Sequence, residues 1–560
     1  MAELRQRRRD RSSAEINSEE EDAKKKDLPE VSKNVGFAAA FAALFITRYF
    51  SASSNIVHDC DEVFNYWEPL HFLLYGSGFQ TWEYSSEFAL RSYLYILIHA
   101  VIGAPASYIL AKVKVFYLIK LAFALVSAAV DGALVAAVSE RFGKRMASYT
   151  LVLLCFASGC YTASTTFLPS TFSMYAISLA SAAVLADKFE AAVAVAALGV
   201  LVGWPFSGLA VLPVVVYSLA NGSSVKVFMA GVKSSVVLIA LSALCDRLFY
   251  GQWKLSILNL VTYNVVGGGD SILYGVEGPL FYLRNGLNNF NLALLLAFGL
   301  PVLLLFVRRS TDKHLLLVIS PLYLWFGFMS LQPHKEERFL YPTYPLVCVA
   351  AAASIERIPG LVPRKMSFVH GLFTKLRPLL LSFILVASYS RTTSLLQGYS
   401  APMQIYKHLP TNPTENSTGK PRICIGSEWH RFPSSFFLPS AKYQVRWLDD
   451  GFRGLMPFPF DSSLGGTKAA PDYFNRHNNA SPKQFLQSDA SCDFVVELVL
   501  DRPGVEYRGN NQTKWTVVAK RLFLDNESSP RLHRAFFIPW AWQSKNSFGT
   551  YRLLIRNVVE

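Results

Sequence analysis

Apolar runs close to the length of a bilayer crossing recur along the chain from residue 34 to about residue 397. The first run, roughly Asn34–Phe50, follows a charged segment and predicts a signal-anchor helix that stays in the protein. Placing the basic loops in the cytoplasm gives roughly eleven crossings, with the N-terminus in the cytoplasm and the C-terminus in the lumen. A soluble domain does not need so many apolar runs. The pattern therefore predicts a polytopic α-helical membrane protein.

The apolar stretch Ser92–Leu110 does not fit this alternation, because a full crossing there would place every later loop on the opposite side. We interpret the stretch as re-entrant or interfacial, and the alternative is that one mid-chain crossing is misassigned. No strong internal repeat is visible, which argues mildly against a transporter built from inverted halves.

The chain changes character at about residue 400, after which no spanning run occurs. Pro, Gly and Asn clusters separate short apolar stretches that alternate with period two and predict strands. We therefore expect a lumenal C-terminal α/β domain at 400–560, a multispanning catalytic domain at 34–399 and a disordered cytoplasmic tail at 1–33. The predicted strands are Arg422–Ile425, Asp493–Leu500, Trp515–Leu524 and Tyr551–Val558.

Acceptor sequons of the form Asn-x-Ser/Thr gather in the C-terminal segment, which favours a lumenal position for it. Pro482 weakens the sequon at Asn479. The glycosylation candidates are therefore Asn416, Asn511 and Asn526.

Cys424 and Cys492 lie in the same segment, and in an oxidising lumen a disulfide between them is possible. The sequence alone does not decide whether they are bonded.

Composition agrees with a membrane protein, with 52% hydrophobic residues and a mean hydropathy of +0.27. The net charge of +14 would suit an acidic partner. The basic residues, however, lie mainly in short loops beside apolar runs, as the positive-inside rule describes. We therefore expect membrane lipids around the chain and no nucleic acid as a partner.

A cluster of ionisable residues, His58-Asp-Cys-Asp-Glu-Val-Phe-Asn65, follows the first apolar run. Ionisable groups at membrane depth are functional candidates by default, and a carboxylate in a cleft is a natural general base. Asp61 and Glu62 are the candidate catalytic residues, and His58 and Asp59 are candidates for substrate binding. The alternative is a solvated acidic loop in which Asp59 or Asp61 caps a helix.

Phe64, Trp67, Leu70 and Leu74 recur at helical spacing after this cluster. They predict a short amphipathic helix in the headgroup plane, which would hold Asp61 beside the membrane surface.

A metal site built from His58, Asp59, Cys60 and Asp61 is the weaker interpretation. Consecutive residues do not easily wrap one ion, and no partner cluster is evident elsewhere in the sequence. We expect no metal.

Two further segments fall in predicted lumenal loops near 332–339 and 251–290, on the same side as the first loop near 51–91. His334, Lys335 and Arg338 offer charge-assisted donors suited to a phosphate. The alternative is a loop whose basic side chains reach lipid headgroups.

Tyr263 and Asn264 in the long loop offer hydrogen bonds to sugar hydroxyls, although an ordinary flexible loop explains them nearly as well. The glycines before Asp270 do not form a phosphate-binding P-loop, because no Lys-Ser/Thr follows and no strand precedes.

Four segments together resemble glycosyltransferase family 22, and within it the endoplasmic reticulum α-1,2-mannosyltransferases of the dolichol-linked oligosaccharide pathway. The resemblance runs from about residue 40 to the C-terminus and includes the tail segment Glu428–Phe436. The four segments are His58–His71, Gly203–Phe206, Tyr263–Val265 and Gln332–Leu340.

The resemblance implies a GT-C-type fold in the endoplasmic reticulum membrane and an inverting reaction at the lumenal face. It implies dolichyl-phosphate mannose as donor and dolichyl-pyrophosphate oligosaccharides with six or eight mannoses as acceptors. Asp61 is then the expected base with Glu62 in reserve, while His334, Lys335 and Arg338 face the donor phosphate.

The residue chemistry agrees with this expectation. A polyprenyl phosphate is already a leaving group, so one carboxylate and a cationic cluster on opposite sides of the sugar carbon suffice. No nucleotide or other cofactor is expected. The alternatives are a sister mannosyltransferase of α-1,6 or α-1,3 linkage or of the glycolipid anchor, a transporter or flippase, and a structural subunit of a glycosylation complex.

Overall fold

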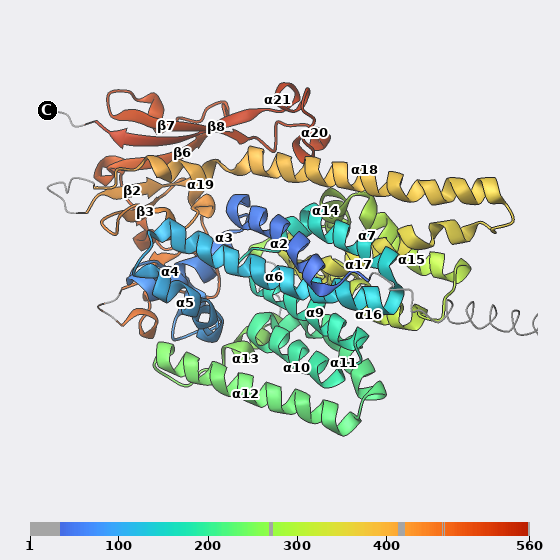
Figure 1. Ribbon diagram of the computed structural model, residues 1–560. Helices are drawn as coiled ribbons and strands as arrows, with labels where there is room; N and C mark the ends of the chain where they lie inside the picture. The colour runs from blue at the N-terminus through green and yellow to red at the C-terminus, as the bar shows by residue number, and fades with distance from the viewer. Residues whose placement is uncertain (1–33, 268–272, 413–419, 462, 464, 558–560) are drawn as a thin grey trace, which may run out of the picture.

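The computed structural model describes residues 34–267, 273–412, 420–461, 463 and 465–557. The predicted tail at 1–33, the candidate Asn416 and Asp270 lie outside these residues. Figure 1 shows an elongated helical bundle with a β-sheet at one end, beside the end of helix α18.

Five of the described helical segments are long and apolar enough to cross a membrane, or six if a pair bent by 112° counts as one span. The predicted number of eleven crossings stays a prediction. The five segments are α6 (Lys112–Phe142), α12 (Ser224–Tyr250), α16 (Asp312–Leu331), Glu337–Leu361 around α17 (Tyr344–Arg357), and α18 (Ser367–Tyr399). The bent pair is α14 (Phe281–Phe290) and α15 (Leu292–Phe306).

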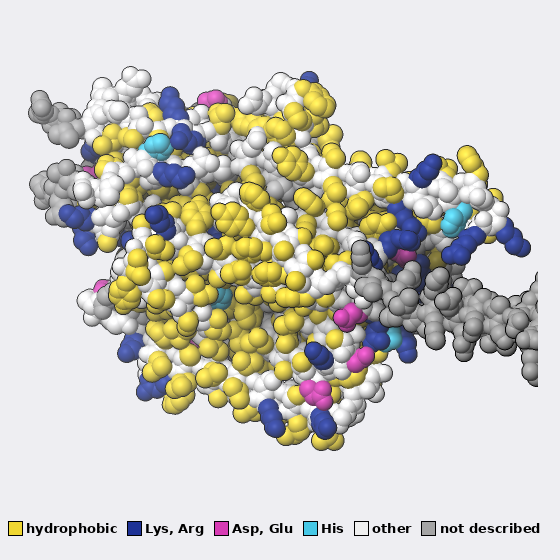
Figure 2. All heavy atoms as spheres, in the orientation of Figure 1, with side chains coloured by type: hydrophobic (Ala, Val, Ile, Leu, Met, Phe, Trp, Pro, Cys, Tyr) yellow, Lys and Arg dark blue, Asp and Glu magenta, His cyan; other side chains and the backbone are white. Residues whose placement is uncertain are grey.

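Shorter helices fill the bundle between these segments, and α12 and α18 lie on its opposite edges (Figure 1). Figure 2 shows that hydrophobic side chains cover the middle of one face of the bundle, whereas Lys and Arg gather toward its ends. This band is the surface expected of a protein surrounded by lipid. The shorter helices are α2 (Phe37–Ser54), α5 (Tyr93–Ser107), α7 (Lys144–Phe156), α8 (Ser158–Ala163), α9 (Pro169–Leu185), α10 (Phe189–Leu198), α11 (Gly208–Asn221) and α13 (Ser256–Val261).

Helix α2 packs along α6, close to the position predicted for the signal anchor. A Cβ at Gly132 of α6 would lie 3.2 Å from the backbone nitrogen of Phe41, so the small residue allows the two helices to approach closely. A buried ion pair of 3.2 Å between Arg48 and Asp131 joins the same two helices. Each charge is neutralised by the other, as membrane depth requires.

Helix α5 occupies most of the stretch that did not fit the predicted alternation. Its 15 residues span roughly 22 Å at the helical rise, which is shorter than the hydrocarbon core of a bilayer. The interfacial interpretation of this stretch stays a prediction, and the length of the helix agrees with it.

The predicted helix after the first loop exists, and its place in the headgroup plane stays a prediction. It is built from α3 (Cys60–Glu62), a π-helical turn at Val63–Trp67 and α4 (Glu68–Tyr75). Phe64 and Trp67 are buried against aromatic rings both of the bundle and of the C-terminal segment. The apolar face of this helix therefore packs against protein, and lipid does not cover it.

The C-terminal segment forms a six-stranded sheet of order β5-β3-β2-β6-β8-β7, parallel from β5 to β6 and antiparallel beyond. The four predicted strands are confirmed within a few residues at their ends. Their bounds and those of the remaining strands are β2 (Arg422–Ile425), β3 (Gln444–Leu448), β5 (Phe485–Leu486), β6 (Phe494–Val499), β7 (Trp515–Leu524) and β8 (Phe548–Arg556).

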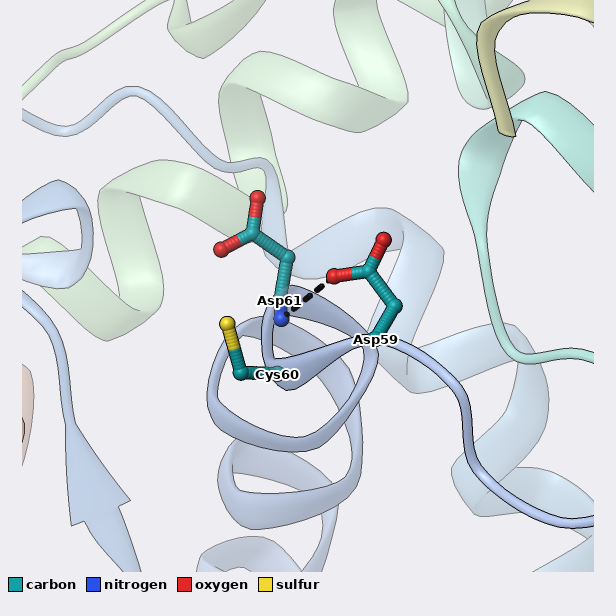
Figure 3. Close-up of side chains that lie close together, drawn as sticks. All are labelled: Asp59, Cys60 and Asp61. Atoms are coloured by element: carbon teal, nitrogen blue, oxygen red, sulfur yellow. Dashed lines mark hydrogen bonds between the residues drawn. The ribbon is translucent and has the colours of Figure 1, made fainter. Parts of the chain in front are cut away.

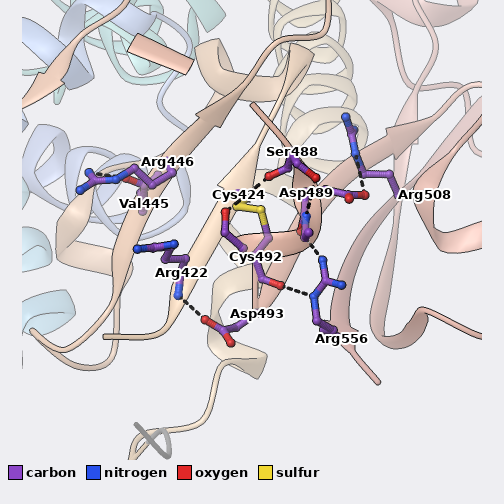
Figure 4. Close-up of a disulfide and its surroundings, with 12 residues drawn as sticks. Arg422, Cys424, Val445, Arg446, Ser488, Asp489, Cys492, Asp493, Arg508 and Arg556 are labelled. Atoms are coloured by element: carbon purple, nitrogen blue, oxygen red, sulfur yellow. Dashed lines mark hydrogen bonds and ion pairs between the residues drawn. A yellow bond between two sulfur atoms is a disulfide. The ribbon is translucent and has the colours of Figure 1, made fainter. Parts of the chain in front are cut away.

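A disulfide joins Cys424 in β2 to Cys492, the second residue before β6 (Figure 4). The two strands are neighbours in the sheet, and the bridge closes a separation of 68 positions. The pairing that the sequence left open is therefore formed.

A second contact ties this segment to the first loop. Strand β1 (Phe79–Gln80) pairs antiparallel with β4 (Phe458–Pro459), so residues almost 380 positions apart form one two-stranded sheet. The C-terminal segment thereby covers the helix that follows the acidic cluster.

Candidate active site

The acidic cluster lies at the start of α3, where the chain leaves an extended segment. Asp59 caps this helix, and its Oδ1 accepts a 2.9 Å hydrogen bond from the backbone N–H of Asp61. The capping role proposed as the ordinary alternative is therefore confirmed for Asp59. Figure 3 shows the side chains of Asp59, Cys60 and Asp61 close together on this turn.

Arg338 joins the first loop to the segment that follows α16. Its guanidinium forms ion pairs with Asp59 at 2.5 Å and with Asp61 at 2.6 Å, and it also contacts Glu336. The two motifs that are about 277 positions apart thus form one charged cluster. One cation among three carboxylates leaves the cluster with negative charge in excess.

The two aspartates of this cluster differ in their protonation behaviour. Burial raises the pKa of Asp59 to about 7, even though Arg338 acts in the opposite direction. Burial also opposes ionisation of Asp61, but the charges of Arg338 and Arg91 outweigh it and lower the pKa of Asp61. Asp61 is therefore the carboxylate that stays ionised at neutral pH.

One oxygen of the Asp61 carboxylate has no partner among the described residues. Its Oδ2 faces Arg338, whereas its Oδ1 has no hydrogen-bond partner in the described part of the chain. Its side chain is 39% exposed, against 24% for Asp59. Both oxygens of Asp59 are occupied, one by the backbone of Asp61 and one by Arg338. Asp61 is thus the carboxylate that a substrate hydroxyl can reach.

Glu62, the reserve base in the sequence-based hypothesis, points away from this cluster, and its position does not favour that role. Its side chain is buried, and its Oε1 accepts hydrogen bonds from the indole of Trp67 at 3.0 Å and the backbone of Phe167 at 2.9 Å. It does not line either of the two large cavities described below. The helical turn after Asp61 rotates the next side chain into the core.

The other predicted donors lie beside Arg338, and both already contact acceptors of the protein. His334 places Nδ1 2.9 Å from the carbonyl of Gly275 and Nε2 2.9 Å from Glu336. Burial lowers its pKa, but these two acceptors outweigh it, and the net pKa is raised. Lys335 is buried and donates to the carbonyls of Glu277 and Gln332.

Two cavities meet at the acidic cluster, and residues His58, Asp59, Phe281 and His430 line both. The first has a volume of about 870 Å³ and the second about 650 Å³. We call the first the arginine cavity, because Arg284, Arg391, Arg431, Arg531 and Arg534 line it. We call the second the aromatic cavity, because Trp82, Trp204, Tyr263, Tyr274, Phe339, Trp429 and Phe452 line it.

The aromatic cavity contains the predicted site residues of all three loops. Asp61, His334, Lys335 and Arg338 line it, together with Tyr263 and Asn264. Rings with a few convergent polar groups are typical of a small-molecule site. His58 lines both cavities, and burial lowers its pKa to about 3, so its imidazole is neutral.

The predicted placement of the cationic loop on the far side of the sugar from the base is wrong for Arg338. The structure pairs this guanidinium directly with Asp61. Two oppositely charged loops that converge on one water-poor cleft neutralise each other at contact distance. Spacing along the chain contains no distance between the two loops, so this pairing could not be predicted from it.

Sequence reasoning missed the arginine cavity. Arg391 could have indicated this cavity, because it is a charged residue inside an apolar run, and such residues are functional candidates. Arg284 lies in the long loop already singled out, and Arg431 lies in the segment Glu428–Phe436 that carried part of the resemblance. Only the folded chain brings these residues to one cavity.

Asp59, Cys60 and Asp61 are also a geometric candidate for a metal site, because their ligand atoms lie within 4.8 Å of one another. Two observations argue against such a site. Arg338 already pairs with both carboxylates. Burial, with the charges of Asp61 and Asp59, raises the pKa of the Cys60 thiol, so it does not offer a thiolate.

The described part of the chain has the GT-C-type fold of membrane-embedded glycosyltransferases. The crystal structure of ArnT from Cupriavidus metallidurans bound to undecaprenyl phosphate superposes with a TM-score of 0.54 at 13% identity, covering 93% of this chain and 98% of that chain. At this identity the likeness concerns the fold.

Residues 39–439 match the Alg9-like mannosyltransferase family, and the chain belongs to that family. The Arabidopsis thaliana protein named Alpha-1,2-mannosyltransferase ALG9 is 54% identical over 522 residues, which cover 92% of this chain and 91% of the relative. The Homo sapiens protein of the same name is 34% identical over 546 residues, covering 92% and 88%. The protein is therefore an enzyme, an α-1,2-mannosyltransferase, and the transporter and structural-subunit alternatives are excluded.

Proposed function

We propose that the protein transfers mannose, with inversion, from dolichyl-phosphate mannose to dolichyl-pyrophosphate oligosaccharides that carry six or eight mannoses. Asp61 is the general base that takes the proton of the acceptor 2-hydroxyl. The observation that carries this assignment is the free Oδ1 of an ionised, partly exposed Asp61 at the wall of the aromatic cavity. Family membership supports the transferred sugar and the pathway of N-glycan precursor assembly.

The aromatic cavity is the proposed site of the acceptor sugar. Its rings give flat apolar surfaces, and Tyr263 and Asn264 add polar groups at its wall. A sugar held there has its hydroxyls within reach of Asp61, which is the geometry that general base catalysis requires.

Arg338 sets the strength of this base. Its ion pair keeps Asp61 ionised, but the same charge makes the carboxylate a weaker proton acceptor. Asp59 and Glu336 share the guanidinium and so reduce its hold on Asp61. We assign Asp59 and Arg338 to positioning the base, and His334 and Lys335 to holding the loop that carries Arg338.

No metal takes part in this proposal. The phosphate leaves without a protonating acid, and Arg338 already fills the space between the two carboxylates.

We further propose the endoplasmic reticulum membrane as the location, with the N-terminus cytoplasmic and the sheet lumenal. The start of α2 lies beside the end of α6, where Val35 donates to Ser139, and Arg141 pairs there with Asp187. Arg309 pairs with Glu356, and Arg357 at the end of α17 pairs with Asp312 at the start of α16. The disulfide in the sheet suits an oxidising lumen.

The proposed domains remain the cytoplasmic tail at 1–33, the catalytic membrane domain at 34–399 and the lumenal domain at 400–560.

Transfer of radiolabelled mannose from dolichyl-phosphate mannose to the six-mannose acceptor tests the proposal with the purified full chain. Wild type should be active, and Asp61→Asn should lose activity while its thermal unfolding stays unchanged. Activity only with an acceptor that takes an α-1,6-linked mannose, or with a glycolipid anchor precursor, would overturn the proposed acceptor.

A further inference from the structure

The arginine cavity takes no part in the proposed proton transfer to Asp61. Its five arginines come from four elements: Arg284 from α14, Arg391 from α18, Arg431 from a 3-10 turn at Ser427–Arg431, and Arg531 and Arg534 from α20 (Arg531–Ala535). Only two carboxylates, those of Asp59 and Glu277, lie among its described lining residues. The cavity therefore carries an excess of positive charge.

Most of this charge is not neutralised within the part of the chain that the structure describes. Arg431 pairs with Glu428 at 2.8 Å. Arg284, Arg391, Arg531 and Arg534 form no ion pair with a described carboxylate. Arg391 donates to the carbonyl of Ala535 at 3.2 Å, and its Nε is buried without a described partner. Unpaired guanidinium groups in a partly buried cavity are suited to an anion with several oxygens, such as a phosphate.

The cavity lies at the end of a lipid-facing helix. Along α18 the side chains of Leu379, Phe383, Val386 and Tyr389 are exposed, and they are apolar or aromatic. Arg391 follows within one turn, and Leu395 and Tyr399 then line the cavity. A phosphate attached to a long apolar chain can therefore place the chain along α18 and the phosphate among the arginines.

The cavity is also close to the base. His58 and Asp59 form part of its wall, and Asp61 follows two residues later in the neighbouring cavity. In the donor, the reacting carbon is C1 of the mannose, and it is bonded directly to the phosphate oxygen. In the acceptor, a whole oligosaccharide arm separates the reacting hydroxyl from the pyrophosphate. A phosphate held next to the base therefore fits the donor.

We propose that the arginine cavity binds the polyprenyl-linked phosphate of the donor, with Arg391 and Arg534 as its principal ligands. This inference rests on the proposed function for the identity of the donor. It moves the role of phosphate ligand away from His334, Lys335 and Arg338, because His334 and Arg338 face carboxylates and Lys335 faces backbone carbonyls. The role passes to arginines that form no ion pair with a described carboxylate and that the sequence did not single out.

The electron balance of the transfer explains why cations are needed there. The bond between the mannose C1 and the phosphate oxygen breaks, and its electron pair stays on that oxygen. The acceptor 2-hydroxyl oxygen forms the new bond to C1, and its proton passes to Asp61. The phosphodiester with one negative charge becomes a monoester with two, and the arginines stabilise the additional charge as it develops.

The test compares Arg391→Gln and Arg534→Gln with Arg453→Gln, a control that removes a charge from an exposed ion pair with Asp449 in the C-terminal segment. In the purified full chain, each cavity variant should raise KM for dolichyl-phosphate mannose by about tenfold or more, because charge-assisted hydrogen bonds to the phosphate are lost. KM for the oligosaccharide acceptor should stay within the range of the control. Arg391→Lys should recover part of the loss.

Product inhibition separates a lipid-linked phosphate from free phosphate. Dolichyl phosphate should inhibit wild type and should inhibit Arg391→Gln much less, whereas dolichol and inorganic phosphate should inhibit neither. A higher KM for the acceptor alone would assign the cavity to the pyrophosphate and overturn the inference, as would unchanged kinetics in both variants.

A direct measurement of dolichyl phosphate binding tests the phosphate site independently of mannose transfer, which tests the proposed function. If wild type fails to transfer mannose, the proposed function fails. Binding that is strong in wild type and weak in Arg391→Gln, with equal thermal unfolding, would still support a phosphate site. Equal binding in both proteins would overturn the site itself.

Discussion

The carboxylate of Glu68 accepts hydrogen bonds from both the backbone N–H and the hydroxyl of Ser435, at 2.6 Å and 2.8 Å. The two residues are 367 positions apart. Ser434 and the backbone of Phe79 also donate to the same buried carboxylate. The helix that follows the acidic cluster is thus fixed to the C-terminal segment by one side chain, and the position of Asp61 depends on both.

This relationship gives the first prediction. Glu68→Gln replaces one carboxylate oxygen by an amide N–H₂, which then faces the N–H and O–H donors of the C-terminal segment. The free energy of unfolding should fall by about 1–3 kcal/mol, because buried donors lose their acceptor. Thermal unfolding in detergent measures the change. Glu87→Gln, at an exposed position, serves as the control and should unfold as wild type does. An equal unfolding temperature in Glu68→Gln would contradict the anchoring role.

The second prediction separates the two neighbouring acids Asp61 and Glu62. Asp61→Asn should lower kcat/KM by about a hundredfold to ten-thousandfold, because the amide cannot accept the hydroxyl proton. Glu62→Gln should keep most of the activity, since the amide oxygen can still accept from Trp67 and Phe167. Steady-state transfer assays measure both. If Glu62→Gln proves the more damaging substitution, the base is wrongly assigned.

The third prediction concerns pH and Asp59. Its pKa is raised from its ordinary value to about 7, so between about pH 4 and pH 7 the folded protein holds a proton that the unfolded chain has released. Stability should therefore fall as pH rises through this window, and Asp59→Asn should weaken the dependence. Melting temperature measured from pH 4 to pH 8 in both proteins gives the comparison. Parallel curves would show that Asp59 does not hold this proton.

The fourth prediction concerns divalent metals. EDTA should leave mannose transfer unchanged, because Arg338 occupies the carboxylates that would bind the ion and Cys60 stays protonated. The assay is run after dialysis against chelator and again after addition of Mn²⁺ or Mg²⁺. Loss of activity with EDTA and recovery with one metal would establish a site at Asp59, Cys60 and Asp61.

The fifth prediction distinguishes two sequons. Asn511 and Asn526 are both exposed, but Asn526 also lines the arginine cavity, and its Oδ1 accepts a hydrogen bond from Tyr399. A glycan on Asn526 would crowd the cavity, so Asn511 is the proposed acceptor. Asn511→Gln should remove one endoglycosidase-sensitive shift in gel mobility, and Asn526→Gln should remove none. The opposite result would leave little room for a phosphate in the cavity.

Elements defined by local patterns could be predicted from the sequence. Strands such as Arg422–Ile425 follow from alternation with period two, and the helix after Gly36 follows from an apolar run. The charged residues of the two short motifs could also be identified, because ionisable groups at membrane depth are costly without a role. These features depend on neighbours in the sequence, so the sequence contains them.

Only the tertiary structure decided how distant segments meet. The sequence could not reveal that Arg338 neutralises Asp61, or that Glu62 turns into the core while Asp61 one residue earlier stays at the cavity wall. It could not gather Arg284, Arg391 and Arg534 into one cavity. Contacts of this kind depend on how helices and the sheet pack, and packing is set by the whole fold and not by local spacing.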